Sequence, residues 1–224
     1  MRQREFKVLQ QEAYQYIKDR ILSGALEYNQ IYSESRIALE VGISRTPVRD
    51  AVHRLYQEGY VDIIPNKGFA LHKMNEQDVM ETYEVRSAIE GYCARKAALH
   101  RQSPAVEQLL GELEASLARQ QKLFEEENDP QAFSQEDRNF HGLLVSSSEN
   151  EAFQDFFGQY MYKLQRLAAL SLQKPHRMEE TLAEHRRIFL AIRGGDPQEA
   201  YAAALDHIQA PLHINLENVY AGIF

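Results

Sequence analysis

Residues 42–61, GISRTPVRDAVHRLYQEGYV, decide how the first part of this chain folds. Thr46 is a residue that caps helices, and Pro47 suits a first helical position because its missing N–H would have no partner there. Val48 and Val52 then fall on one apolar face. The stretch therefore predicts a short amphipathic helix.

Two arginines flank the first turn of this expected helix. Arg45 and Arg49 lie away from its apolar face. Cations near a helix N-terminus oppose the helix dipole, so local stability does not favour them. Binding to a polyanion outside the protein would account for the two arginines. From these residues alone, ordinary solvated surface charges remain the alternative.

The charges of the chain are unevenly distributed. The 224 residues carry a net charge of -8, from 25 Lys and Arg and 33 Asp and Glu. Residues 1–75 carry 11 basic and 9 acidic side chains, whereas residues 76–224 carry 14 basic and 24 acidic ones. This asymmetry predicts a small segment that approaches phosphates, joined to an acidic segment with a different task.

The cellular compartment can be inferred from what the composition excludes. Cys93 is the single cysteine, which rules out an intramolecular disulfide and fits a reducing cytosol. No apolar run resembles a signal peptide or reaches membrane-spanning length. We therefore expect a cytoplasmic protein with no membrane partner.

The segment before residue 75 contains signals for three helices and a hairpin. The first helix is expected over residues 8–23, with Tyr14, Ile17, Ile21 and Leu22 at helical spacing and Gly24 at its end. The second follows a cap at Ser33 and stops at Gly42, and the third ends near Gly59. Two β-rich runs separated by Pro65, Asn66 and Gly68 then predict a hairpin. Together they predict a winged helix-turn-helix over residues 1–74.

Residues 32–69 carry a family resemblance. The SRTPVR core, the EGYV after the third helix and the NKGF of the wing resemble the DNA-binding domain of the GntR family of bacterial transcription regulators. The resemblance implies that the helix opened by Arg45 enters the major groove of double-stranded operator DNA. It also implies that the wing reaches the minor groove.

The resemblance assigns DNA contacts residue by residue. Base and phosphate contacts fall to four positions at the start of the third helix: Ser44, Arg45, Thr46 and Arg49. The wing tip falls to Lys67 and Gly68. Many family members carry an arginine directly after the glutamate of the second helix; here Ser35 stands there, and Arg36 follows as the candidate. The chemistry agrees, because arginine pairs bidentately with guanine O6 and N7.

From Asn75 onward the pattern becomes helical throughout. Asn75 can cap a helix to about Leu99, and cap-then-proline pairs open further helices at Ser103-Pro104, Asp129-Pro130 and Asp196-Pro197. Two more are expected over residues 150–172 and 177–193, where Gly194-Gly195 ends the second. The whole chain is therefore expected to be mainly α, with an antiparallel all-α bundle over residues 75–224.

A possible metal site stands out in this bundle. Asp137 and His141 are four residues apart and project from one helix face, while His185 and His207 belong to later helices. One carboxylate and three imidazoles suit a divalent ion such as zinc, nickel or manganese. An ordinary surface pair is the alternative for these residue types alone.

A second resemblance covers the bundle. YEVRSAIEGYCARKAA (83–98), DRNFH (137–141), residues 184–200 and the final DHI resemble the FCD ligand-binding domain of the FadR-type GntR subfamily. In the metal-binding branch of that subfamily, an aspartate and three histidines in these motifs hold a divalent ion. The resemblance thus implies the ligand set Asp137, His141, His185 and His207.

The same resemblance implies an effector pocket. It points to Arg86, and also to Arg166, as groups facing a small carboxylate-like effector. An arginine beside a metal with open positions suits an organic anion. The alternative for Arg86 is a surface salt bridge with Glu90 at i+4.

These features predict a homodimeric, ligand-responsive transcription regulator, with a metal-sensing regulator or a metal-dependent enzyme as alternatives. An enzyme is not expected, since HExxH and HxxEH motifs are absent from the sequence. Glu184 directly precedes His185, so it points about a quarter-turn away along the helix.

Overall fold

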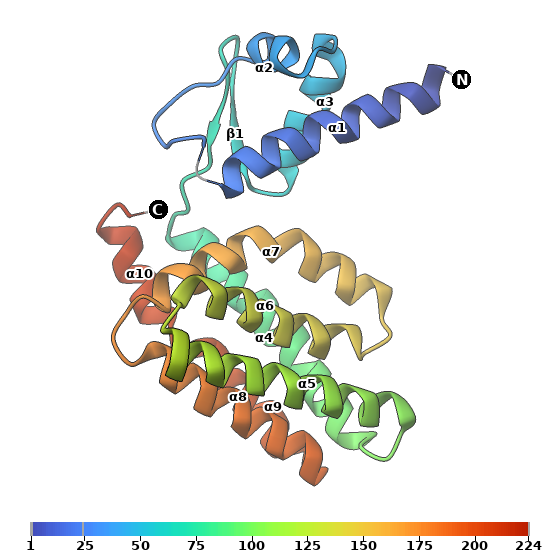
Figure 1. Ribbon diagram of the computed structural model, residues 1–224, viewed down its shortest axis with the longest axis vertical. Coiled ribbons are helices and arrows are strands. Elements are labelled where there is room, and N and C mark those ends of the chain that lie inside the picture. The colour runs from blue at the N-terminus through green and yellow to red at the C-terminus, as the bar shows by residue number, and fades with distance from the viewer. Residues whose placement is uncertain (1, 24, 224) are drawn as a thin grey trace. The chain divides into compact units, whose positions relative to one another are not determined.

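The computed structural model describes residues 2–23 and 25–223. It divides the chain into two compact units, Met1–Lys73 and Met74–Phe224. The first unit combines helices with a small sheet, whereas the second is a stack of helices (Figure 1).

The first unit contains three helices and a two-stranded sheet, as predicted. Its elements are α1 (Arg2–Leu22), α2 (Glu34–Val41), α3 (Arg45–Gln57), β1 (Val61–Ile64) and β2 (Gly68–Leu71). The strands are antiparallel and pair Val61 with Leu71 and Ile64 with Gly68. Helix α1 begins earlier than expected, and the predicted stop at Gly24 lies outside the described residues.

Helices α1 and α3 pack together to form the core of this unit. Ile17 and Ile21 are buried, as are Val48 and Val52 on the facing helix. Leu22, grouped with Ile17 and Ile21 by its helical spacing, belongs to α1 but does not share their buried face, because its side chain is 47% exposed. It follows Ile21 by one residue and is therefore rotated about 100° away from the buried face.

The start of α3 differs from the prediction by two residues. Ser44, with extended backbone, is the residue before the first turn, and the helix begins at Arg45. Thr46 and Pro47 are therefore the second and third helical residues rather than the cap and the first. The proline is tolerated there because N–H groups in the first turn have no acceptor within the helix.

The wing gains a contact that the sequence did not indicate. Tyr32, just before α2, exchanges two backbone hydrogen bonds with Phe69: Tyr32 N donates over 2.7 Å and Phe69 N donates over 3.0 Å. Gly68 has a φ of +135°, and a Cβ there would collide with the carbonyl oxygen of Tyr32. Glycine is therefore required where the wing meets this segment.

The second unit is built from helices in its described residues. They are α4 (Glu76–Leu99), α5 (Pro104–Lys122), a π-helical turn (Leu123–Glu127), α6 (Pro130–Ser146), α7 (Glu151–Ser171), α8 (Arg177–Gly194), α9 (Pro197–Gln209) and α10 (Leu212–Tyr220). The predicted caps hold, and Asn75 forms a capping box with Asp78. The π-helical turn and α10 were not predicted.

Helix α4 is the central element of the second unit. It packs against α6, α7, α8, α9 and α10. Small residues permit its closest approach to α9, since a Cβ on Gly91 would lie 2.9 Å from the Tyr201 ring. Figure 1 shows α5, α6 and α7 side by side on one side of α4. Across the described residues, no helix is both long and apolar enough to span a bilayer.

Candidate functional site

Four side chains from three helices converge inside the second unit. Asp137 and His141 lie one turn apart on α6, His185 lies on α8 and His207 on α9. One candidate ligand atom from each lies within 4.8 Å of the others, and all four residues are buried. We call this set the Asp/His centre.

The three imidazoles of the Asp/His centre point their Nε2 atoms inward. Nε2 of His207 lies 3.2 Å from that of His185 and 3.1 Å from that of His141. Oδ1 of Asp137 lies 3.6 Å from Nε2 of His185 and 3.7 Å from Nε2 of His141. Helix packing thus gathers donor atoms that are up to 70 positions apart in the sequence.

An acceptor behind each ring sets its orientation. Nδ1 of His185 lies 2.8 Å from Oε1 of Gln120, and Nδ1 of His207 lies 2.7 Å from Oε2 of Glu184. An amide oxygen or a carboxylate can only accept, so each of these Nδ1 atoms carries the proton and each Nε2 offers a lone pair.

His141 also has a carboxylate behind its ring, but the contact differs in geometry. Its Nδ1 lies 2.5 Å from Oε2 of Glu90, as an ion-pair contact rather than an aligned hydrogen bond. Three inward Nε2 atoms and one carboxylate oxygen form a donor set that fits a divalent cation once His141 is neutral, and outer acceptors of this kind are typical of histidine metal ligands.

The pKa values of these groups follow from burial and from their mutual charges. Burial lowers the pKa of His185 well below its ordinary value, and the charges of His207 and His141 lower it further. Burial also opposes charge on His141, but the Glu90 carboxylate raises its pKa to about 9. Burial would raise the pKa of Asp137, yet the hydrogen bond and charge of His141 bring it below its usual range.

Arg86 on α4 contacts both Glu90 and the Asp/His centre, and its pair with Glu90 is buried rather than on the surface. Its Nε donates to Oε1 of Glu90 over 2.7 Å, which is the i+4 pair. Its Nη2 lies 3.1 Å from Nε2 of His141, so the guanidinium also faces the Asp/His centre. Glu90 is buried, which would raise its pKa, but Arg86 and His141 lower that pKa to about 2.

A small cavity adjoins the Asp/His centre. It encloses about 10 Å³ and is lined by Arg86, Asp137, Arg138, His141, Phe157, Met161, Leu164, Gln165 and Ala168. Arg166 is not part of this lining. Its guanidinium lies over the Tyr162 ring, 5.7 Å from the ring centroid. Arg138 lines the cavity although the sequence did not single it out. Its place directly after the predicted ligand Asp137 in the sequence is the signal that could have identified it.

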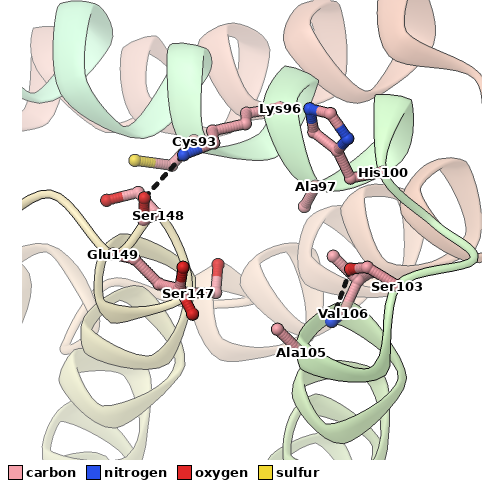
Figure 2. A pocket seen from close by; sticks show the side chains of 10 residues that line it. All are labelled: Cys93, Lys96, Ala97, His100, Ser103, Ala105, Val106, Ser147, Ser148 and Glu149. Carbon is pink, nitrogen blue, oxygen red and sulfur yellow. Dashed lines mark hydrogen bonds between the residues drawn. The ribbon is translucent and has the colours of Figure 1, made fainter.

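A larger cavity of about 270 Å³ lies where α4 and α6 end and α5 begins (Figure 2). Nζ of Lys96 donates to the backbone oxygen of Ser148 over 2.6 Å, which satisfies a carbonyl just past the end of α6. Cys93 lines this cavity but is 1% exposed. These contacts stabilise helix ends, and none of the predicted site residues lies there.

The residues expected to contact DNA are exposed on the first unit. Ser44 precedes α3, Arg45 and Thr46 lie in its first turn, and Arg49 lies at the start of its second turn. Nε of Arg45 donates to Oε2 of Glu34 over 2.9 Å, while its side chain stays 66% exposed. No ion pair with the described residues holds Arg49.

The remaining DNA-binding candidates lie on the wing and on α2. Lys67 is exposed between the two strands, and Gly68 begins β2. Arg36 is 80% exposed and pairs with Glu40 over 3.1 Å. The side chains of Lys67 and Arg36 are therefore both accessible to solvent.

Comparisons with known proteins cover most of the chain. Residues 9–71 match the family model "Bacterial regulatory proteins, gntR family", and residues 81–210 match the FCD domain model. The chain is 28% identical over 197 residues to the "Probable D-xylose utilization operon transcriptional repressor" of Paenarthrobacter nicotinovorans, covering 88% of this chain and 84% of that protein. It is 27% identical over 199 residues to the "HTH-type transcriptional repressor RspR" of Escherichia coli (strain K12), covering 89% and 85%.

A solved structure shares the fold. E. coli McbR/YncC superimposes with a TM-score of 0.70 at 18% identity, covering 94% of this chain and 98% of that one. At this identity the likeness concerns the fold alone.

Proposed function

This chain belongs to the gntR family of bacterial regulatory proteins and carries the FCD domain, and we propose that it regulates transcription in response to a small organic anion bound beside a divalent metal ion. The protein is a transcription regulator of this type. The operator, the dimer, the metal and the effector are the parts proposed here.

For the DNA side, the proposal places the first turn of α3 in the major groove. Arg45 and Arg49 are exposed in the first two turns of α3, and the N–H groups of a helix start can hold a phosphate. Arg45 then pairs with a guanine, and Lys67 at the wing contacts the backbone. Contacts from one short helix and one wing read too few bases for selectivity in a genome. We therefore propose a homodimer on a palindromic operator with two half-sites.

For the effector side, the main support is the convergence of three histidine Nε2 atoms and the Asp137 carboxylate, with the Arg86 guanidinium beside them. A bound zinc, nickel or manganese ion would supply a Lewis-acidic centre that accepts an anionic oxygen. Asp137, His141, His185 and His207 would hold the ion. Arg86, fixed by Glu90, would pair with the effector's charge.

Effector binding changes operator affinity only if the effector prefers one of two arrangements of the dimer. Residues 72–76 join strand β2 to α4, and the Asn75 capping box fixes the start of that helix. We propose that a change in the conformation of this join alters the separation between the two α3 helices of the dimer, which read the two half-sites.

The test is an operator-binding titration of the metal-loaded protein with small carboxylates, compared between wild type, Arg86→Ala and His185→Ala. We expect wild type to change operator affinity by about 5–150-fold and both variants to lose the response. An unchanged response in both variants would place the effector elsewhere. Operator release by a chelator alone, with no organic ligand, would instead favour a metal sensor.

A further inference from the structure

We infer that the effector is a short, straight-chain monocarboxylate whose apolar tail packs against α7, rather than a polyhydroxylated acid. This inference rests on the proposed function, because it assumes that the anion binds in the cavity beside the Asp/His centre. It adds the chemical class of the rest of the ligand.

The cavity has two chemically different sides. Its charged groups come from α4 and α6, namely Arg86, Asp137, Arg138 and the imidazole of His141. Its other side is α7, which contributes Phe157, Met161, Leu164 and Ala168. All of α7 lies in the described part of the chain, and none of its residues belongs to the Asp/His centre. A ligand with its carboxylate at the centre therefore extends toward apolar side chains.

Few partners are available for hydroxyl groups on that extension. The polar side chain that α7 presents to the cavity is Gln165, and its Oε1 already accepts a hydrogen bond of 3.0 Å from Nη1 of Arg138. Its amide nitrogen can donate to one hydroxyl, but further hydroxyls would face apolar side chains. A hydroxyl buried without a partner loses its hydrogen bonds to water. Each such hydroxyl should weaken binding by about tenfold.

The size of the cavity limits the tail to a few carbons. A volume of about 10 Å³ holds about one water molecule, so a longer ligand must displace side chains. Met161 is half-buried, and its unbranched thioether can adopt other rotamers at low cost. We therefore expect a chain of about four carbons to enter as Met161 moves aside.

The binding test uses the metal-loaded full chain and four acids in isothermal titration: acetate, butyrate, threonate and succinate. Butyrate should bind about tenfold more tightly than acetate, because two more methylene groups are buried. Threonate, which has the same carbon number with three hydroxyl groups, should bind more weakly than butyrate. Succinate tests whether a second carboxylate is preferred at Arg138.

Variants of the α7 wall provide the second readout. Met161→Gln keeps the shape of the side chain but makes it polar, so the butyrate-to-acetate affinity ratio should fall toward one. Ala168→Leu should fill the cavity and remove butyrate binding while acetate still binds. Met80→Gln on α4, where the side chain is 38% exposed, is the matched control and should leave the ratio unchanged.

The outcomes separate this inference from the proposed function. Threonate or succinate binding as tightly as butyrate, or a ratio unaffected by both α7 variants, would overturn the apolar-tail inference and leave a carboxylate effector in place. If none of the four acids binds the metal-loaded protein, a carboxylate effector at this centre is excluded, and both proposals fail.

Discussion

Oε2 of Glu184 lies 2.7 Å from Nδ1 of His207, so a carboxylate on α8 orients an imidazole on α9. Arg177, itself 3% exposed, holds the same carboxylate through two hydrogen bonds of 2.8 and 2.6 Å. Glu184 directly precedes His185 in the sequence. Helix α8 therefore supplies one candidate ligand and the group that orients another, and Glu184 is engaged rather than facing an open site as a general base.

Removing the charge of Glu184 should weaken metal binding. Glu184→Gln would hold the His207 ring less strongly, and we expect metal affinity to fall by about 10–100-fold, as for other outer partners of histidine ligands. Competition against a chelator of known affinity measures this change. Glu179→Gln on the same helix, where the side chain is 64% exposed, should leave the affinity unaltered.

Metal content itself is the second prediction. Purified protein should contain about one divalent ion per chain, and His185→Ala or His207→Ala should largely remove it, since each lost ligand weakens a four-ligand site. A chelator should lower the melting temperature of wild type but hardly that of the variants, because the ion stabilises only the folded form. Elemental analysis that finds no metal even after reconstitution would contradict the site.

Substitutions of Arg86 should impair the effector response without removing the metal. Arg86→Lys keeps a positive charge beside Glu90 but loses the planar fork, so metal content should persist while the effector response weakens. Arg86→Ala should lose the response entirely. It should also lower the free energy of unfolding by about 3–5 kcal/mol, since the buried Glu90 carboxylate loses its partner. Denaturant unfolding of the metal-loaded protein measures that cost. A full effector response in Arg86→Lys would show that the fork geometry is not used.

The DNA contacts predict two distinguishable losses. Arg45→Ala should cost about 1–3 kcal/mol on the operator and relax its sequence preference, because a guanine pair is lost. Lys67→Ala should weaken binding to all sequences alike and reduce the salt slope by about one. Fluorescence anisotropy over a range of salt concentrations measures both. If Arg45→Ala binds the operator as tightly as wild type, the groove contact is wrong.

Cys93 should be unreactive while the protein is folded. Burial raises the pKa of its thiol to about 11, from an ordinary 9.0, although the hydrogen bond with Ser148 opposes this. Between pH 9 and 11 the folded state therefore keeps the thiol proton while the unfolded state loses it. The contribution of the protonated Cys93 to the free energy of unfolding is thus complete below pH 9 and declines as the pH rises toward 11. Mass spectrometry after iodoacetamide treatment at pH 8 should show little alkylation of native protein and complete alkylation in urea. Rapid alkylation of the native protein would contradict the burial of the thiol.

Signals close together in the sequence determined most of the helices. Asn75, Ser103-Pro104, Asp129-Pro130 and Asp196-Pro197 each mark a helix start, because capping and proline geometry depend on only a few neighbouring residues. The start of α3 was misplaced because Ser44 and Thr46 both suit the cap, and local rules do not choose between them. Helix α10 was missed because Pro211, just before it, gave no capping signal of the kind that marks the other starts.

The prediction of the Asp/His centre rested partly on local sequence, but the site itself forms only through tertiary packing. Helical periodicity alone put Asp137 and His141 on one face. Their meeting with His185 and His207, and the placement of Glu90 and Gln120 behind the rings, came only with the packing of α4, α5, α8 and α9. Sequence spacing says nothing about how far apart residues on different helices lie, since that distance is set by which side chains fill the space between the helices. A buried glutamate or glutamine in a helical pattern therefore acquires a partner, and a role, only when the helices pack.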